Sequence, residues 1–420
     1  MSLEYDPMSP RWRDDPYPAY RRLRDEAPVH FSAESNTYCV SRYDDVQQVL
    51  NDPDTFSSRA MFTMLMMAGQ ERMSFGWTAL RGMFKMAIAS RTRPGAVFSA
   101  RNLIAADGPL HTGMRSIVNR GFTPRRVGAW QPRAKELVAD CMAKLEHGGS
   151  FDLVRDLAVP LPVTLIAEMI GVESARLADF KRWSDVVVHY AAGPGRANRF
   201  APEFIDTMCE LTRYLRGVTR ERRENPQDDL ISTILTSQEG EDGLSEFEVV
   251  MFVTLLLVAG NETTTNLIGN AVGALLDHPH ELARVAADPT LIPSLIEETL
   301  RFDAPIQLVF RNATRDTELA GVGIPSGAWV VPLLGSANRD ERRFEDPDRF
   351  DVARNPQGHV GFGFGPHFCL GASLARLEAT AALEALVPVL PTLRKTDAGP
   401  ARVDSFLVRG PSQLELAPAA

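Results

Sequence analysis

The chain is poor in cysteine and has no closely spaced cysteine pair. Its four cysteines are scattered along 420 residues without any C-x-x-C spacing, at Cys39, Cys141, Cys209 and Cys369. Disulfide scaffolds and structural zinc sites depend on paired or closely spaced cysteines. The sequence therefore argues against both, and it favours a reducing compartment.

The sequence also lacks an export signal and a run long enough to span a membrane. The first residues, MSLEYDPMSPRWRDD, contain no apolar core of the kind that a signal peptide needs. The longest apolar stretch, residues 249–260, contains Thr254 and is shorter than the roughly 18 to 20 residues that cross a bilayer. We therefore expect a cytoplasmic protein without a transmembrane anchor, in which this stretch forms a buried helix.

No excess of basic residues and no interdomain linker is present. The 45 basic and 54 acidic residues leave a net charge of -9, which argues against a nucleic-acid partner. No Gly/Ser linker, low-complexity tract or fixed-period repeat divides the chain. Despite the length of 420 residues, we predict a monomer with a single domain covering residues 1–420.

Helical patterns dominate the middle of the chain, and short strand-like runs lie near both ends. We expect helices over residues 124–145, 163–169, 173–190, 202–224, 245–276 and 372–386. Strands are expected at 29–31 and 37–41, and hairpins at 321–331 and 403–416. This arrangement predicts a mainly α fold with a small β-rich lobe.

The longest predicted helix has a well-defined start. Ser245 and Glu248 have capping-box spacing, in which each side chain satisfies a free donor at the helix terminus. The helix should end before Pro279, which gives about 31 residues and about 46 Å. Because its middle is apolar nearly all round, it should cross the interior of a large domain.

The segment around Cys369 carries the strongest chemical signal. Residues 362–371 read FGFGPHFCLG, and Gly363, Gly365 and Gly371 permit positive φ and a close approach of backbone to a flat ligand. The helix predicted to follow would favour a thiolate through its N-terminal dipole. A lone cysteine is more often a small buried hydrophobe, but this surrounding pattern indicates a ligand for a soft metal.

Small and polar residues interrupt the apolar stripe of the long central helix. Spacing places one set on a single face, namely Leu255, Val258, Ala259, Glu262 and Thr263. Gly260 costs about 1 kcal/mol relative to alanine in a helix, and the Thr263 hydroxyl can compete for a backbone carbonyl. Glu262 and Thr263 could relay protons from this loosened turn, although a buried salt bridge would explain Glu262 equally well.

Both segments resemble motifs of the cytochromes P450. The loop matches the family's haem-binding pattern at Phe362, Gly365, His367, Cys369 and Gly371, and it is followed by the family-like Leu374-Ala375-Arg376. Residues 259–264 (AGNETT) are similar to the family's acid–alcohol motif. The resemblance covers nearly the whole chain, from about Tyr17 to Leu416, and it implies the P450 fold.

The resemblance also implies a haem b cofactor and roles for individual residues. Cys369 would be the proximal iron ligand, with Phe362 packed near the sulfur and His367 reaching a propionate. Thiolate donation to iron favours O–O cleavage, and Glu262 and Thr263 would be the catalytic pair.

Two further segments resemble the family's haem-supporting motifs. Residues 107–115 match the pattern Asp-x-Pro-x-His-x-x-x-Arg, so that His111 and Arg115 would face one propionate, and the position of Arg311 matches another propionate arginine. Glu298 and Arg301 lie where the family has its Glu-x-x-Arg pair, and Arg349 would complete that ion network. Most such pairs elsewhere are solvated surface pairs of little energetic value.

The positions that match the pocket and the docking surface of this family imply the kind of substrate and the kind of electron donor. The pocket would be lined by Leu255, Val258, Ala259, Ile306, Gln307, Phe406 and Leu407, which suits a hydrophobic small molecule with one polar group held by Gln307. A basic cluster formed by Arg115, Arg120, Arg125 and Arg126 would dock an acidic ferredoxin. The alternative for this cluster is a solvated helix end.

Two segments suggest mobile covers of the pocket. Seven of the 14 methionines fall in one stretch, at Met61, Met64, Met66, Met67, Met73, Met83 and Met86. Methionine adapts to varied apolar shapes, so a lid, plain core filling and a surface for a partner or membrane are all open. The Gly193-Pro194-Gly195 break resembles the other mobile segment of the family.

The implied activity is insertion of one oxygen atom of O2 into an apolar substrate, with electrons from NAD(P)H through a ferredoxin-type partner. Rival hypotheses are a peroxide-driven peroxygenase, a haem-thiolate isomerase, and a haem-binding sensor or carrier without turnover. Glu262 and Thr263 favour activation of O2.

Overall fold

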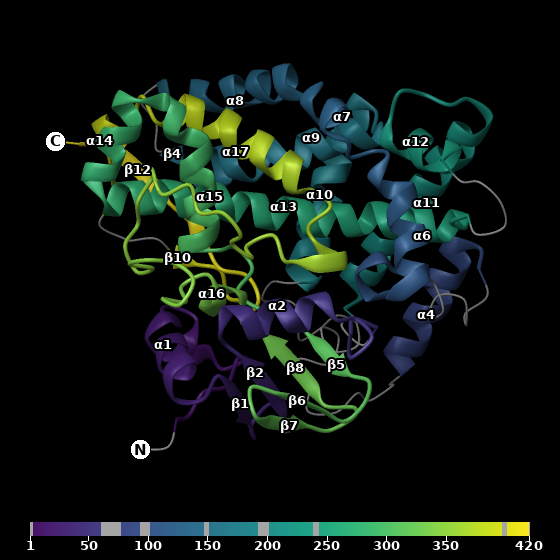
Figure 1. The fold of residues 1–420 in the computed structure, drawn as a ribbon. Coiled ribbons are helices and arrows are strands. Elements are labelled where there is room, and N and C mark those ends of the chain that lie inside the picture. The colour runs from purple at the N-terminus through teal and green to yellow at the C-terminus, as the bar shows by residue number, and fades with distance from the viewer. Residues whose placement is uncertain are drawn as a thin grey trace. The chain divides into compact units, whose positions relative to one another are not determined.

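The computed structural model describes residues 3–59, 77–92, 101–146, 151–191, 201–237, 243–396 and 401–419, and its elements are labelled in Figure 1. The chain forms two units that alternate along the sequence. Unit 1 comprises Met1–Met61, Val127–Leu161 and Thr263–Ala420, and unit 2 comprises Phe62–Arg126 and Pro162–Glu262. Helices predominate and the sheets are small, so the predicted mainly α fold with a small β component is confirmed.

All strands of the described residues lie in unit 1. Its five-stranded sheet has the order β1-β2-β8-β5-β3, formed by β1 (Val29–Ser32), β2 (Thr37–Val40), β8 (Trp329–Pro332), β5 (Arg311–Ala313) and β3 (Phe56–Ser57). Only the β2–β8 pair is parallel. The predicted strands near the N-terminus are therefore confirmed.

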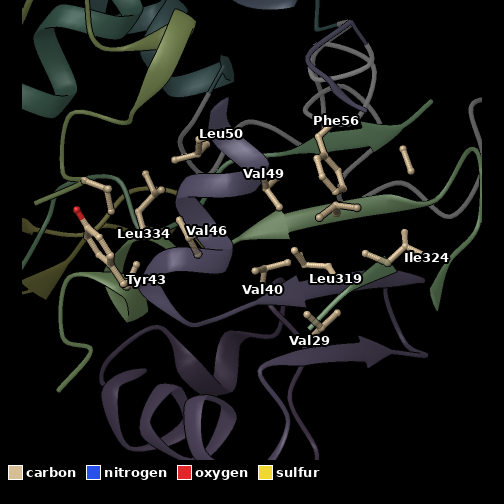
Figure 2. Packing of buried hydrophobic residues seen from close by; sticks show 14 of the residues in the cluster. Val29, Val40, Tyr43, Val46, Val49, Leu50, Phe56, Leu319, Ile324 and Leu334 are labelled. Carbon is tan, nitrogen blue, oxygen red and sulfur yellow. The ribbon is translucent and has the colours of Figure 1, made fainter. Parts of the chain in front are cut away.

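Helix α2 (Tyr43–Asn51) packs against this sheet and fixes one side of the cysteine loop. Figure 2 shows Val49 of α2 pointing toward the strands that carry Val40 and Phe56. These three side chains and those of Val46 and Leu50 are at most 3% exposed. Full burial of each such side chain stabilises the fold by about 1.5 to 3 kcal/mol. The C-terminal end of α2 is thereby held as a rigid support.

Turn chemistry corrects the predicted hairpin at 321–331. Strand β7 (Val322–Ile324) pairs with β6 (Thr317–Leu319) across a two-residue turn, in which Ala320 and Gly321 have φ of 49° and 80°. Two consecutive positive φ values suit the twist of a tight hairpin. The segment after Pro325 leaves this hairpin, because β8 joins the five-stranded sheet.

The hairpin predicted near the C-terminus is present with shifted limits. Strand β10 (Ala401–Arg402) pairs with β11 (Pro411–Gln413). Strand β12 (Glu415–Pro418), which includes the predicted end of that hairpin, instead pairs with β4 (Phe151–Asp152) and β9 (Leu393–Lys395).

The helices follow the predicted patterns with one clear break. The α-helices assigned to unit 1 are α1 (Tyr17–Glu26), α2, α8 (Gln131–Glu146), α14 (Pro279–Ala287), α15 (Ile292–Phe302), α16 (Leu334–Ala337) and α17 (Ala372–Leu386). The helix predicted over 124–145 is divided into α7 (Pro124–Gly128) and α8. Pro132 stands in the first turn of α8, where its missing N–H costs nothing.

Unit 2 is helical. It contains α4 (Trp77–Ser90), α6 (Gly108–Asn119), α10 (Leu177–Ala191), α11 (Pro202–Glu224), α12 (Leu230–Thr236) and most of α9 (Pro160–Ile170). Helix α4 packs closely on α11, since a Cβ added at Gly82 would lie 2.5 Å from the Ile205 Cδ1 atom. Ala89, Ile205 and Cys209 form a buried cluster between these two helices.

Short 3-10 turns link several of these elements. They are η1 (Pro10–Trp12), η2 (Leu103–Ala105), η4 (Ser174–Arg176), η6 (Pro289–Leu291), η7 (Gly365–His367) and η8 (Leu390–Thr392). A π turn, η3, covers Val154–Ala158.

Helix α13 (Glu246–Asp277) contains 32 residues, about 48 Å at 1.5 Å per residue. The predicted capping box is confirmed, because the Ser245 N–H donates to Glu248 Oε2 at 2.8 Å and the Glu248 N–H donates to Ser245 Oγ at 3.3 Å. Among the described residues α13 is the one helix long and apolar enough to cross a membrane, yet 59% of that apolar window is buried. Thr265 and Asn270 are also buried and bonded to protein carbonyls, as in a core helix.

A buried carboxyl group joins α17 to α13. Glu378 of α17 is 2% exposed. Burial raises the pKa of Glu378, and a hydrogen bond with Thr264 of α13 offsets part of this effect, so that the pKa is about 8. Glu378 therefore holds its proton at neutral pH.

We expect the Glu378→Gln variant to remove a pH dependence of stability. Between the ordinary carboxyl pKa of about 4.3 and the folded value of about 8, the folded chain binds a proton that the unfolded chain has lost. Stability should therefore fall as pH rises through this window, by up to about 1.4 kcal/mol per pH unit. Melting temperatures from pH 5 to 8.5 measure this slope, which the variant should flatten.

Glu384→Gln is the matched control, because Glu384 lies on the same helix with its side chain 41% exposed. It should leave the slope as in the parent protein. An equal slope in the parent and in Glu378→Gln would show that Glu378 does not hold the proton.

Candidate active site

The cysteine loop is closed by its own backbone. The Cys369 N–H donates to the Phe362 carbonyl at 2.9 Å, and Gly363 and Gly365 have φ of 72° and 69°. A Cβ at Gly365 would lie 2.9 Å from the Leu50 carbonyl oxygen at the end of α2, so both conformation and space require glycine there. Gly371 differs from the expectation, because it caps α17 with φ of -85°.

The four cysteines lie in different environments. Cys39 and Cys209 are buried, and burial raises the pKa of both thiols, which keeps them protonated and unreactive. Cys141 lies within α8. Cys369 is partly exposed and stands three residues before α17 begins. Of the four, Cys369 is the one placed to act as a thiolate ligand.

The polar turn of α13 carries an acid whose proton is available near neutral pH. Glu262 and Thr263 are both partly buried, whereas Ala259 and Gly260 are exposed and Leu255 is half-buried. Burial raises the pKa of Glu262 to about 7. The boundary between the units falls between Glu262 and Thr263, and the side chain of Val258, a predicted pocket residue, lies outside the described residues.

Of the four residues predicted to bind haem propionates, two lie in each unit. In unit 2, His111 and Arg115 lie one turn apart on α6, and His111 is 3% exposed. In unit 1, Arg311 of β5 is 4% exposed and donates to the Phe310 carbonyl at 2.8 Å. His367 Nε2 lies 3.1 Å from Ser58 Oγ. Their role toward a propionate stays a prediction.

Two segments predicted to line the pocket lie side by side in unit 1. The Gln307 N–H donates to the Leu407 carbonyl at 3.0 Å, and Ile306 forms an antiparallel bridge with Val408. Phe406 is buried with its ring centroid 6.0 Å from that of Phe310. The backbone thus brings together the predicted apolar residues from both segments.

The side chain of Gln307 does not fit its predicted role. It is 4% exposed, its Nε2 donates to the Ala304 carbonyl at 2.8 Å, and its Oε1 accepts from the Tyr20 hydroxyl at 3.4 Å. Because both ends of the amide already bind protein groups, we do not assign Gln307 to the substrate.

The Glu-x-x-Arg network is present with a different third member. Arg301 binds Glu298 through two hydrogen bonds of 2.8 Å, and both side chains are fully buried. The Arg354 Nε atom lies 3.1 Å from Glu298. Arg349 was predicted for this place, but its guanidinium pairs with Asp351 and only its carbonyl accepts from Arg301. The assignment of Arg349 is therefore wrong.

Sequence reasoning missed two acidic residues around the cysteine loop. Glu378 interrupts the apolar face formed by Leu374, Ala382 and Leu386 at four-residue spacing, which is the signal that could have found it. Glu297 precedes the recognised Glu298 and binds Arg376 and His359. No spacing in the sequence identifies that contact.

Two predicted covers of the pocket cannot be placed. Most of the methionine-rich stretch and the Gly193-Pro194-Gly195 break lie outside the described residues. Within the described part, Met86 contacts the buried cluster of α4 and α11, with its sulfur 3.5 Å from Cys209 Sγ.

The chain is similar to known proteins over nearly its whole length. The family model for cytochrome P450 matches residues 168–389. Cytochrome P450 107B1 of Saccharopolyspora erythraea is 39% identical, over 97% of this chain and 96% of its own. The vitamin D(3) 25-hydroxylase of Pseudonocardia autotrophica is 37% identical, over 98% of this chain and 96% of its own.

Solved structures show the same fold. Bacterial CYP109E1 from Bacillus megaterium, crystallised with testosterone, superposes with a TM-score of 0.82 at 34% identity, covering 97% of this chain and 100% of that one.

The donor set of this chain suits the cofactor of that family. In this family the haem iron is held by a cysteine thiolate, and cations suit its two propionates; Cys369, Arg115 and Arg311 are residues of those kinds. Cys369 also follows a loop that glycine lets pass close to a flat ring. The chain belongs to the cytochrome P450 family, and it is a monooxygenase with haem b as its cofactor.

Proposed function

We propose that this enzyme inserts one oxygen atom of O2 into a small apolar molecule, with two electrons from NAD(P)H delivered through a ferredoxin reductase and a ferredoxin. The observation that carries this proposal is the adjacent pair of Glu262, with a pKa of about 7, and Thr263 on α13. The reaction consumes two protons for each O2, and water carries away the second oxygen atom.

The acid and the alcohol divide the work of proton delivery. With a pKa of about 7, Glu262 can release a proton and regain one at neutral pH, as a general acid requires. The hydroxyl of the next residue, Thr263, can accept a hydrogen bond from the protonated Glu262 carboxyl and donate a hydrogen bond to a second acceptor. Glu378, bound to Thr264 and with a pKa of about 8, is a second proton store.

Cys369 is the proposed iron ligand, and His111, Arg115, Arg311 and His367 are the proposed partners of the propionates. When bound, the haem supplies the site for O2 and for its reduction. Phe362 would pack against the haem, since the hydrogen bond between its carbonyl and the Cys369 N–H keeps it near the proposed iron ligand. Ala259 would leave space for the haem beside α13, because its side chain is only a methyl group.

The substrate is proposed to be a rigid, largely apolar molecule. Leu255, Ile306, Phe406 and Leu407 offer apolar surface. We include Val258 with them because of its position in the sequence of the helix. Relatives are named for vitamin D(3) or were crystallised with testosterone. Steroids and secosteroids therefore form the first panel of candidate substrates.

The electron donor is proposed to dock through the basic cluster. Arg120, Arg125 and Arg126 are exposed, and Arg115 is half-buried. Arg126 donates to the Thr233 hydroxyl at 2.9 Å and lies 3.7 Å from the fully exposed Asp228, and its side chain is 47% exposed, so this cation can also meet an acidic partner. We further propose that the protein is a cytoplasmic monomer whose two units form one catalytic domain.

Two rival functions keep the same cofactor. A peroxygenase would use hydrogen peroxide directly, and a sensor or carrier would bind haem without turnover. Glu262 and Thr263 favour O2 over peroxide, because hydrogen peroxide already carries the two protons that this pair would help to deliver, and also the two electrons that NAD(P)H would supply.

Replacing the ligand atom should abolish the activity. We expect Cys369→Ser to lose the red-shifted Soret band of the reduced, carbon-monoxide-treated protein, because a serine oxygen cannot replace thiolate donation. The same absorption spectrum on Cys141→Ser is the control and should keep the band. A normal band and normal turnover in Cys369→Ser would refute the assignment.

Removing the alcohol should uncouple electron use from product formation. In a system with NADPH, ferredoxin reductase and ferredoxin, we expect Thr263→Ala to release several times more hydrogen peroxide per NADPH consumed. Reduced oxygen would then be released as hydrogen peroxide, because the hydroxyl that directs the protons is missing. Assays of peroxide, NADPH and hydroxylated steroid measure the ratio.

Thr254→Ala is the matched control for this experiment. Thr254 lies on the same helix, and its hydroxyl donates to the Val250 carbonyl at 2.9 Å. It should leave the ratio unchanged. Unchanged coupling in Thr263→Ala would remove Thr263 from the mechanism, and turnover with peroxide alone would favour the peroxygenase.

A further inference from the structure

A cluster of charged side chains lies directly behind the cysteine loop. Glu297 of α15 accepts two hydrogen bonds from Arg376 of α17, at 2.6 and 2.9 Å. The same carboxylate lies 2.9 Å from Nε2 of His359, which precedes the loop. These three residues, here named the Glu297 cluster, connect α15 and α17 to the start of the loop.

The hydrogen bonds define the charge on each member. The Gly361 N–H donates to His359 Nδ1 at 3.1 Å, so the proton of a neutral ring must lie on Nε2 and point at Glu297. Burial alone would raise the pKa of Glu297, but the bonds from Arg376 and His359 outweigh it and lower the pKa to about 2. The cluster therefore contains one fixed anion and one fixed cation.

Arg376 lies over the aromatic ring of Phe362, the residue whose carbonyl closes the cysteine loop. Its guanidinium carbon lies 4.6 Å from the centroid of the Phe362 ring, and the Phe362 carbonyl binds the Cys369 N–H. Glu297 raises the pKa of Arg376 most, and the charge of Cys369 adds to this effect. The Arg376 cation is thus coupled both to the aromatic ring and to the sulfur.

The neighbouring glutamates have separate tasks. Glu298 and Arg301 are fully buried, Arg301 donates to the Asn338 and Pro347 carbonyls, and Glu298 accepts from the Asp351 N–H, as expected of a pair that holds the fold. Arg376 is 38% exposed and Glu297 is 20% exposed, so this pair lies closer to solvent than the pair of Glu298 and Arg301. The contact of Arg376 with Phe362 gives the Glu297 cluster a connection to the cysteine loop in addition to any effect on stability.

We propose that Arg376, held over Phe362 by Glu297 and His359, is a positioning residue that sets the electrostatic potential at the Cys369 sulfur and so the reduction potential of the haem. A cation near the sulfur favours the electron-richer ferrous state. Glu297 fixes the position of that cation and also reduces its effect. The inference rests on Cys369 as the iron ligand.

The two charges should act in opposite directions. In the haem-loaded, substrate-free protein, we expect Arg376→Met to shift the ferric–ferrous equilibrium up to about tenfold toward ferric, which is about 59 mV for a one-electron couple. Glu297→Gln should shift it toward ferrous, because the cation is no longer balanced. Spectroelectrochemical titration measures both midpoints. A merely structural cluster would not give shifts of opposite sign.

Two further variants are controls for the effect of the Arg376 charge. Arg376→Lys retains the charge and should stay near the midpoint of the parent protein. Lys135→Met removes a cation that binds Glu384 of α17 at 2.7 Å, away from the loop residues, and should leave the midpoint unchanged.

The carbon-monoxide difference spectrum separates this inference from the ligand assignment. If the parent protein lacks the red-shifted band, the assignment of Cys369 fails. With that band present, shifts of equal sign, or no shift, in Arg376→Met and Glu297→Gln overturn the proposal. Loss of the band in Arg376→Met but not in Arg376→Lys supports it, since charge then determines ligation, whereas loss in both overturns it.

Discussion

The hydrogen bond from the Cys369 N–H to the Phe362 carbonyl is the constraint on which the loop depends. It forces the eight-residue segment from Phe362 to Cys369 to reverse direction within a small space, and Gly363 and Gly365 accept the positive φ values that this requires. The turn at Gly365 presses on the end of α2, which the five-stranded sheet supports through Val46 and Val49. The position of the sulfur therefore depends on a hydrophobic cluster whose other residues lie far away in the sequence.

Four glutamates show how surroundings decide what one side chain does. Arg301 and Arg354 balance the charge of the fully buried Glu298, and Arg376 and His359 hold the pKa of Glu297 at about 2. Glu262 and Glu378 are likewise removed from water, but burial governs them and their pKa values are about 7 and 8. The chain thus keeps fixed anions beside its guanidinium groups and exchangeable protons on the two carboxyls near Thr263 and Thr264.

Local patterns predicted much of this protein, whereas pairings over long distances were not predictable. The limits of α11 and α17 and the capping box of α13 follow from periodicity and from Ser245 and Glu248 alone. The partner of β8 does not, because a strand shows its own alternation but not its neighbour. Arg354 replaced the expected Arg349 for the same reason, since two nearby arginines differ only in which one the folded chain turns inward. Family resemblance supplied the loop motif but not Glu297, whose contacts join α15 and α17.

The polar residues of α13 also hold the two segments that are proposed to line the substrate pocket. Asn270 donates to the carbonyls of Asp303 and Arg409, so it binds one end of each of these segments. Gly269 allows Pro411 to approach, because a Cβ there would lie 2.5 Å from its ring. The turn that presents Phe406 and Leu407 is thereby fixed to the same helix that carries the hydroxyl of Thr263. Buried amides are costly unless bonded, and here the bonds fix the segments that carry the proposed substrate-binding residues to the helix that carries the proposed proton-delivering pair.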